Sequence, residues 1–300
     1  MKNITKLSVT IGITTCYGDK SILDTIRSIR RSKGTGSFQI ILVADRTPLQ
    51  KELKEQLKNY HVTVIENKTE GSLTKKQKQI LSLTKTDLIF FIQDDVLLDK
   101  NTFFTVIKRF QNHPKTTMIS ILNSPVPATA FFEDIINVGT ELANKFAYYW
   151  NHGDNYLSVI GRFMAFRTNA LKKFKIPNEI SSVDAFYYFE NKRNDGVYEY
   201  ISQVSVYFKN PQNIAGHLRK SSRFQYSEFE LSRYFRDIKS EYKIPKSAVF
   251  KGVSKLFLKK PVKTMVYLLI YFYTRVARIK PSVVLDPLWE VDTSTKKVLY

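Results

Sequence analysis

The alternation of apolar and polar positions in the first 122 residues predicts a repeating strand-helix order. Apolar, β-branched runs read as strands at 8–14, 38–44, 62–65, 88–93 and 118–122. Between them, apolar residues return at helical spacing, as in Leu49, Leu53 and Leu57. Strands separated by helices indicate right-handed βαβ units, so we expect an α/β fold with a Rossmann-like, doubly wound, mostly parallel sheet.

The pattern is less regular after Asn123. The segment Ser124–Asn155 is rich in proline, aromatic residues and asparagine, so we expect an irregular surface there that holds a ligand. Regular patterns return as a strand at 158–167, a helix at 184–193, a β segment at 197–209 and a helix at 222–242.

The fourth strand ends on two adjacent carboxylates, Asp94 and Asp95. Its run 88–92 is apolar without alternation, which is typical of a parallel strand buried on both faces. Ligands of open α/β sheets bind beyond the carboxyl ends of the strands. Two acids at that place indicate a bound cation, although a strand can also end in two acids simply where it turns into solvent.

Composition and charge narrow the possible classes of protein. A chain of 300 residues with 43% hydrophobic residues can bury a large core. Its single cysteine, Cys16, excludes an internal disulfide and suits a reducing compartment, and the polar residues 1–7 give no sign of a signal peptide. A net charge of +20 predicts a polyanionic partner, which could be nucleic acid, an anionic membrane or a phosphorylated substrate.

Half of this excess charge lies in one segment. Between Glu241 and Asp286 there is no acid but ten lysines and arginines. Within residues 245–280, the pattern predicts a basic amphipathic helix followed by an uncharged run at 264–274. At ~1.5 Å per residue, this run is too short to cross a ~30 Å hydrocarbon core. We expect attachment to an anionic membrane surface and not nucleic-acid binding, because the apolar stretch is continuous. The alternative is that these helices pack on the rest of the chain or on a second subunit.

Several motifs in order resemble those of family 2 glycosyltransferases of the GT-A type over roughly 8–224. They are the strand-loop Val9–Tyr17, the segment Ile41–Thr47, the stretch Phe91–Val96, the passage of Gly161 and Phe166–Leu171, the tripeptide Ser182–Asp184, and the region Pro211–Phe224. The chain departs from the family pattern where Gln93 replaces the first acid of the metal motif, and where Lys220 and Phe224 replace the Gln and Trp of the last motif.

The resemblance implies an inverting transferase that moves a sugar from a nucleotide-sugar, expected to be a UDP-sugar, to a lipid-linked or cell-envelope glycan. Asp184 would be the general base, and Asp95 would bind Mg²⁺ or Mn²⁺, with His217 as a possible third ligand. The implied donor-binding residues are Thr14, Thr15, Tyr17, Asp45, Asp94 and Arg223. The enzyme would work at the cytoplasmic face of the membrane. Its catalytic domain would cover 1–225, with a nucleotide-binding half (1–123) and an acceptor half (124–225), and a basic helical segment with a tail would follow at 226–300.

Simpler interpretations exist for three of these residues. Asp184 could be only a helix N-cap, Asp45 a cap ahead of Pro48, and His217 a structural histidine. Because of Gln93, the chain could also be an inactive module that binds membranes or polyanions. A sugar-phosphate nucleotidyltransferase is a further alternative, but residues 15–19 do not supply the glycine-rich phosphate loop that this class needs.

Overall fold

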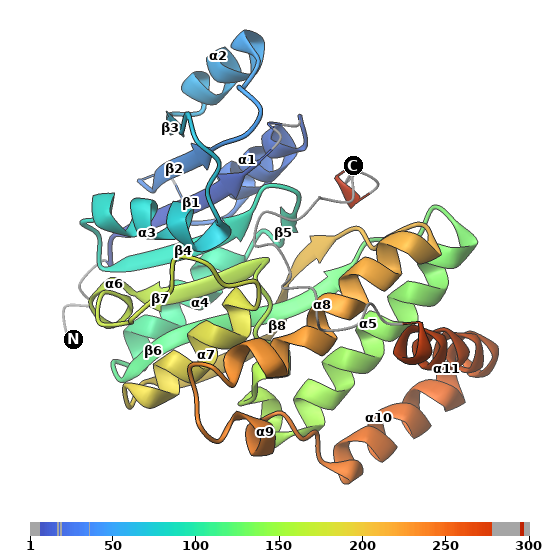
Figure 1. Ribbon diagram of the computed structural model, residues 1–300. Helices are drawn as coiled ribbons and strands as arrows, with labels where there is room; N and C mark the ends of the chain where they lie inside the picture. The colour runs from blue at the N-terminus through green and yellow to red at the C-terminus, as the bar shows by residue number, and fades with distance from the viewer. Residues whose placement is uncertain (1–6, 17, 19, 36, 278–294, 297–300) are drawn as a thin grey trace.

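The computed structural model describes residues 7–16, 18, 20–35, 37–277 and 295–296, and its centre is a mostly parallel sheet of eight strands in the order β3-β2-β1-β4-β7-β6-β8-β5 (Figure 1). The strands are β1 (Val9–Thr15), β2 (Gln39–Ala44), β3 (Val62–Glu66), β4 (Leu88–Gln93), β5 (Leu97–Leu98), β6 (Thr116–Pro125), β7 (Phe163–Arg167) and β8 (Val197–Phe208). Strands β1 to β4 pair in parallel, and β7 lies antiparallel between β4 and β6. The predicted α/β fold with a doubly wound sheet is confirmed.

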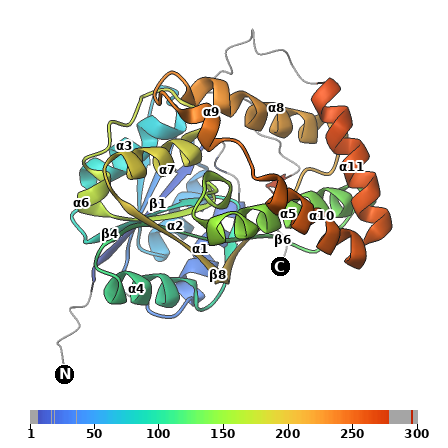
Figure 2. The same cartoon turned by 90° about the horizontal axis from the view of Figure 1, so that it is seen from below.

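Helices cover both faces of this sheet (Figure 2). On one face lie α1 (Ser21–Arg31), α2 (Lys51–Asn59) and α4 (Thr102–Asn112), and on the other lie α3 (Leu73–Leu83), α6 (Thr168–Leu171) and α7 (Val183–Arg193). Strand β4 contributes Phe90 to the first core and Phe91 to the second, and both side chains are fully buried. The prediction that β4 is covered on both faces is therefore confirmed.

The segment after Asn123 is more regular than its composition indicates. Helix α5 (Phe131–Tyr149) occupies most of it, followed by two short 3-10 turns at Asn151–Gly153 and Tyr156–Ser158. Asn137 and Asn144, which suggested a loop, lie inside α5 and donate to the carbonyls of Val126 (3.0 Å) and Asn123 (2.8 Å). The expectation of an irregular surface was wrong, because these asparagines fasten the helix to the strand before it.

Helix α8 (Ile214–Leu231) begins earlier than the sequence pattern predicts. The Asn213 side chain accepts a hydrogen bond from the N–H of Gly216 at 2.8 Å and so caps the helix at its start. The chain then leaves the helix at Leu231 and forms the short α9 (Ile238–Glu241). As a result, His217, Lys220 and Arg223 follow one another along a single helix at three-residue intervals.

The basic segment folds into α10 (Lys246–Lys259) and α11 (Pro261–Val276), and both pack against α5. Leu256 of α10 is fully buried with Val138 and Leu142. The absence of a side chain at Gly139 of α5 allows Tyr267 of α11 to pack against the backbone of α5, because a Cβ at this position would lie 2.1 Å from the Tyr267 ring. The alternative that these helices pack on the rest of the chain is thus correct for their inner faces. Within the described residues, no helix has the length and apolar character needed to cross a bilayer.

Candidate functional site

The carboxyl ends of the central strands meet at one edge of the sheet. Thr15 pairs with Ala44, and Thr14 pairs with Gln93, which brings the ends of β1, β2 and β4 together. Because β7 runs in the opposite direction, its beginning lies at the same edge, where the carbonyl of Arg162 accepts from the Gln93 N–H at 3.3 Å. The predicted site residues on β1, β2 and β4 therefore share one edge with a residue that the sequence analysis did not single out, Arg162.

Asp94 and Asp95, directly after β4, contact a cation from the C-terminal end of the chain. The Nζ of Lys296 lies 2.5 Å from Asp94 Oδ1 and 3.4 Å from Asp95 Oδ2. Burial raises the pKa of Asp95, with a contribution from neighbouring Asp94, while Lys296 and Arg162 oppose that rise. Burial acts to lower the pKa of Lys296, but the two carboxylates more than offset it and raise this pKa above its ordinary value. The two acids are thus paired with a lysine ammonium group, and a divalent metal at Asp95 stays a prediction.

Asp184 lies across Gly161 from the end of β4. It is the second residue of α7, whose N-cap residue is Ser182, so the interpretation of Asp184 as a simple cap was wrong. Its Oδ2 accepts from the Gly161 N–H at 3.2 Å. A Cβ at Gly161 would lie 3.9 Å from both Asp184 Oδ2 and Gln93 Nε2. The side chains of Asp184 and Gln93 therefore lie on either side of Gly161, at ordinary contact distance from where a Cβ would be.

Three basic side chains, those of Arg162, Lys220 and Arg223, gather around these acids. The Arg162 guanidinium lies 3.6 Å from the centre of the Phe208 ring, and Lys220 Nζ lies 5.4 Å from the same ring. Burial lowers the pKa of Arg162 to about 10, although Asp95 and Asp184 act to raise it. Burial also lowers the pKa of Lys220 and of Arg223. Three neighbouring cations that are each costly to bury form a place suited to an anionic group.

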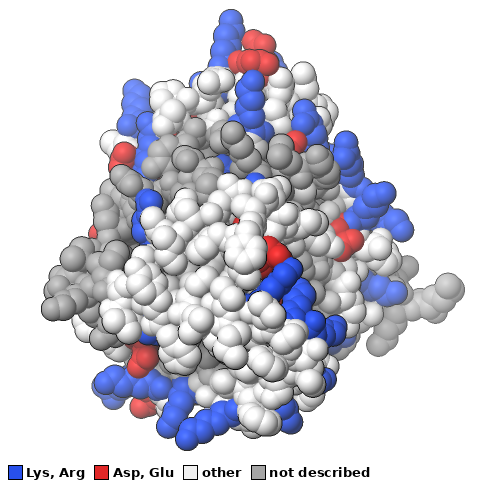
Figure 3. Space-filling view, turned by 90° about the vertical axis from the view of Figure 1, so that its right-hand side faces the viewer, with Lys and Arg blue, Asp and Glu red and all other residues white. Residues whose placement is uncertain are grey.

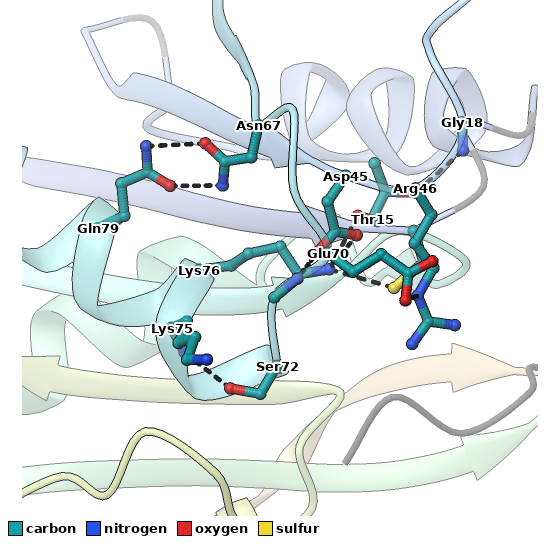
Figure 4. Close-up of polar contacts among 12 residues, drawn as sticks. Thr15, Gly18, Asp45, Arg46, Asn67, Glu70, Ser72, Lys75, Lys76 and Gln79 are labelled. Carbon is teal, nitrogen blue, oxygen red and sulfur yellow. Dashed lines mark hydrogen bonds and ion pairs between the residues drawn. The ribbon is translucent and has the colours of Figure 1, made fainter. Parts of the chain in front are cut away.

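Asp45 at the end of β2 is enclosed by protein groups (Figure 4). Lys76 of α3 donates to Asp45 Oδ1 at 2.8 Å and to the Thr15 carbonyl at 3.1 Å, while the N–H of Gly71 donates to Asp45 Oδ2 at 2.9 Å. The Asp45 side chain is 0% exposed, and α2 has Gln50 as its N-cap, so Asp45 does not cap that helix. Asp45 and Lys76 together hold the loops after β1 and β2 and the start of α3. Base recognition by Asp45 stays a prediction, and Tyr17 lies outside the described residues.

His217 is buried in the first turns of α8, with its ring against Phe132 at 6.4 Å between centroids. Burial and the neighbouring Lys220 lower its pKa to about 4. Over the described part of the chain, no three His, Cys, Asp or Glu side chains are grouped so as to hold a metal ion. The structure therefore does not group His217 with Asp94 and Asp95 as a third metal ligand, and metal binding at Asp95 stays a prediction.

The low pKa of His217 predicts a pH-dependent contribution to stability. A histidine with a pKa of about 4 when folded and an ordinary value when unfolded binds its proton more readily in the unfolded chain. The free energy of unfolding should therefore fall as the pH falls from 7 towards 4, by up to ~3 kcal/mol from this group. In urea titrations, His217→Asn should show a shallower loss over this range than the wild type. Parallel curves for the two proteins would contradict the assignment.

Comparison with known proteins identifies the family of this chain. The sequence model of the family described as "Glycosyltransferase like family 2" matches residues 8–227. Comparison with curated protein sequences gives no match.

Solved structures of GT-A glycosyltransferases have a similar fold. A mannosyltransferase of Pyrobaculum calidifontis, solved with GDP-Man and Mn²⁺, superposes with a TM-score of 0.55 at 13% identity, covering 93% of this chain and 78% of its own. Residues 1–349 of S. aureus TarS, solved with UDP-GlcNAc, give a TM-score of 0.51 at 13% identity, covering 90% of this chain and 88% of that one. At these identities, the likeness establishes the GT-A fold.

Proposed function

The chain belongs to glycosyltransferase family 2, and we propose that it transfers a sugar with inversion from a nucleotide-sugar, expected to be a UDP-sugar, to a lipid-linked or cell-envelope glycan. One observation carries the proposal: the Asp184 carboxylate and the Gln93 side chain at the end of β4 lie on either side of Gly161, and the neighbouring Arg162 interacts with both Asp95 and Asp184. The similar folds solved with GDP-Man and UDP-GlcNAc support a nucleotide-sugar donor and leave both bases to be tested.

The donor diphosphate fits the mixed charges of this edge. Asp95, with Asp94 beside it, offers the hard oxygen ligands that Mg²⁺ and Mn²⁺ prefer. When bound there, the metal would stabilise the charge that develops on the departing diphosphate. Arg162, Lys220 and Arg223 would donate to the phosphate oxygens, and the structure of a similar fold with Mn²⁺ supports the choice of metal.

Asp184 would act on the acceptor. Its half-buried carboxylate would take the proton of the acceptor hydroxyl while that oxygen attacks the anomeric carbon. The new carbon-oxygen bond forms as the bond to the diphosphate breaks on the opposite face of the sugar, so the anomeric configuration inverts. The hydrogen bond from the Gly161 N–H holds the carboxylate in place at 3.2 Å.

A panel of nucleotide-sugars tests this function directly. UDP- and GDP-sugars are incubated with the protein and Mn²⁺ or EDTA, and release of the free nucleotide is measured. We expect one donor to be cleaved slowly by water in Mn²⁺ and none in EDTA. If no donor of either series releases its nucleotide and neither nucleotide binds, the chain is the inactive, membrane- or polyanion-binding module.

The outer face of α10 and α11 supports the proposal of membrane attachment. We define the outer apolar face by its exposed side chains, which are Phe250, Leu258, Val262, Met265, Leu269, Phe272 and Val276. Those on α11 recur every three or four residues, and the exposed Lys251, Lys255 and Lys259 lie on the adjoining helix. Figure 3 shows a broad area of uncharged side chains on this side of the molecule, interrupted near its centre by a short band of basic and acidic side chains and bordered by lysine and arginine along its lower edge. An apolar face with lysines around it suits an anionic bilayer at the cytoplasmic surface, where each lysine would contribute roughly 1 kcal/mol.

Acidic substitutions on this face should abolish membrane binding. The double variant Leu269→Asp, Phe272→Asp removes two apolar side chains, each of which would contribute ~1.5–3 kcal/mol to the free energy of membrane binding when buried in the bilayer. We therefore expect the affinity for phosphatidylglycerol vesicles, measured by co-sedimentation, to fall at least about tenfold. Phe104→Asp is the matched control, because Phe104 is similarly exposed but lies on α4. Unchanged sedimentation of the double variant would contradict attachment through this face, and binding to DNA alone would favour a polyanion-binding surface.

A further inference from the structure

One contact among the described residues that the proposed function does not use joins Lys296 to the two carboxylates after β4. Lys296 and Asp94 are 202 positions apart, and the Lys296 side chain is buried there. No local sequence pattern predicts this pair, and the roles proposed above for the site residues do not use it. The ammonium group contacts the same two side chains that are proposed to hold the metal.

An ammonium ion and a divalent metal cannot share these oxygens. Mg²⁺ binds carboxylate oxygens at about 2.1 Å and takes them with near-ideal octahedral geometry. Lys296 Nζ lies 2.5 Å from Asp94 Oδ1 and 3.4 Å from Asp95 Oδ2, so a metal at these oxygens would be in direct contact with it. Two cations at such a distance repel strongly in a buried site. Binding of one therefore requires that the other leave.

The charges of the site agree with such an exchange. With Lys296 in place, four basic side chains (Arg162, Lys220, Arg223 and Lys296) interact with four acids (Asp94, Asp95, Asp184 and, behind Arg223, Glu230). A divalent ion that enters together with a nucleotide-sugar diphosphate brings two positive and about two negative charges. Replacing Lys296 by this pair therefore leaves the site close to neutral.

We propose that Lys296 is an internal competitor of the metal-nucleotide complex: its ammonium group neutralises Asp94 and Asp95 in the free enzyme and is displaced when the donor binds with its metal. The inference rests on the function proposed above. It predicts that the apparent metal affinity of the wild type equals the intrinsic affinity multiplied by the fraction of molecules in which the contact is broken. A contact formed in 90–99% of molecules corresponds to a reduction of roughly 10- to 100-fold.

Equilibrium dialysis of Mn²⁺, with UDP or GDP at equal concentration in both chambers, tests the competition without measuring turnover. We expect Lys296→Ala to bind Mn²⁺ at least about tenfold more tightly than the wild type, because the competing charge is gone. Lys296→Arg keeps the charge and should bind as the wild type does. Lys260→Ala makes the same change in net charge between α10 and α11, where Lys260 pairs with Glu141, and should also bind as the wild type does.

The outcomes separate this inference from the proposed function. Equal or weaker Mn²⁺ binding by Lys296→Ala would overturn the competition and make the contact a structural ion pair or a support of the donor site. An equal gain in Lys260→Ala would also overturn it, since the effect would then follow from net charge alone. No Mn²⁺ binding by any of the four proteins would overturn the proposed metal site together with the competition.

Discussion

Asp184→Asn is expected to lower kcat by roughly 10²- to 10⁴-fold while donor affinity stays near that of the wild type. The substitution keeps the shape of the side chain, and the amide oxygen can still accept from the Gly161 N–H. It removes the group that accepts the acceptor's proton, and general bases typically contribute a factor of this size. Steady-state kinetics with the donor found in the nucleotide-release panel measure the loss, and calorimetry measures donor binding separately.

Asp154→Asn is the matched control for this experiment. Asp154 is also an acid near α7, but it pairs with Lys192 at 2.8 Å and with the Tyr188 hydroxyl on a different part of that helix. Its amide variant should turn over as the wild type does. If Asp184→Asn keeps most of its rate, Asp184 is not the base, and if it loses donor binding together with rate, its role is in holding the donor.

Lys76→Met is expected to lower the free energy of unfolding by about 3–5 kcal/mol, since it leaves a buried carboxylate without its cation. Asp45 has no exposed side-chain surface, and its remaining partner within the described part of the chain would be the Gly71 N–H. Lys76 also donates to the Thr15 carbonyl, so the loops after β1 and β2 would both loosen. Urea denaturation at neutral pH measures the change.

The neighbouring residue provides the control for Lys76. Lys75 pairs with Glu179 at the surface, and both side chains are about half exposed, so Lys75→Met should cost less than ~1 kcal/mol. Adding Asp45→Asn to Lys76→Met should recover much of the lost stability, because the uncompensated charge is then absent. A loss of the same small size in Lys76→Met and Lys75→Met would contradict a structural role for the buried pair.

The sequence predicts the first half of the fold well because each strand and helix there has its own local pattern. The strand at 88–93 combines a continuous apolar run with an abrupt polar end, and the structure buries it on both faces as expected. Helix α5 was missed because its asparagines and aromatic residues resemble a loop in composition, while their hydrogen bonds to the preceding strand form only in the folded chain.

The candidate site is predictable where it depends on strand ends and unpredictable where it depends on distant partners. Asp94, Asp95 and Asp184 stand at the ends or beginnings of regular elements, so their positions could be inferred. Lys76 and Lys296 look like any other lysine of a basic chain, and only the folded structure brings them to Asp45 and to Asp94. Arg162 could have been noticed as a charged residue directly after Gly161 at the start of a buried strand.

The central claim is that the Asp94–Asp95 edge binds a nucleotide through a divalent metal. Calorimetric titration of UDP and of GDP into the wild type and Asp95→Ala, in Mn²⁺ and in EDTA, tests it most directly. We predict that one of the two nucleotides binds the wild type in Mn²⁺, fails to bind in EDTA, and fails to bind Asp95→Ala in either condition. Binding that persists in EDTA or in Asp95→Ala would contradict the claim.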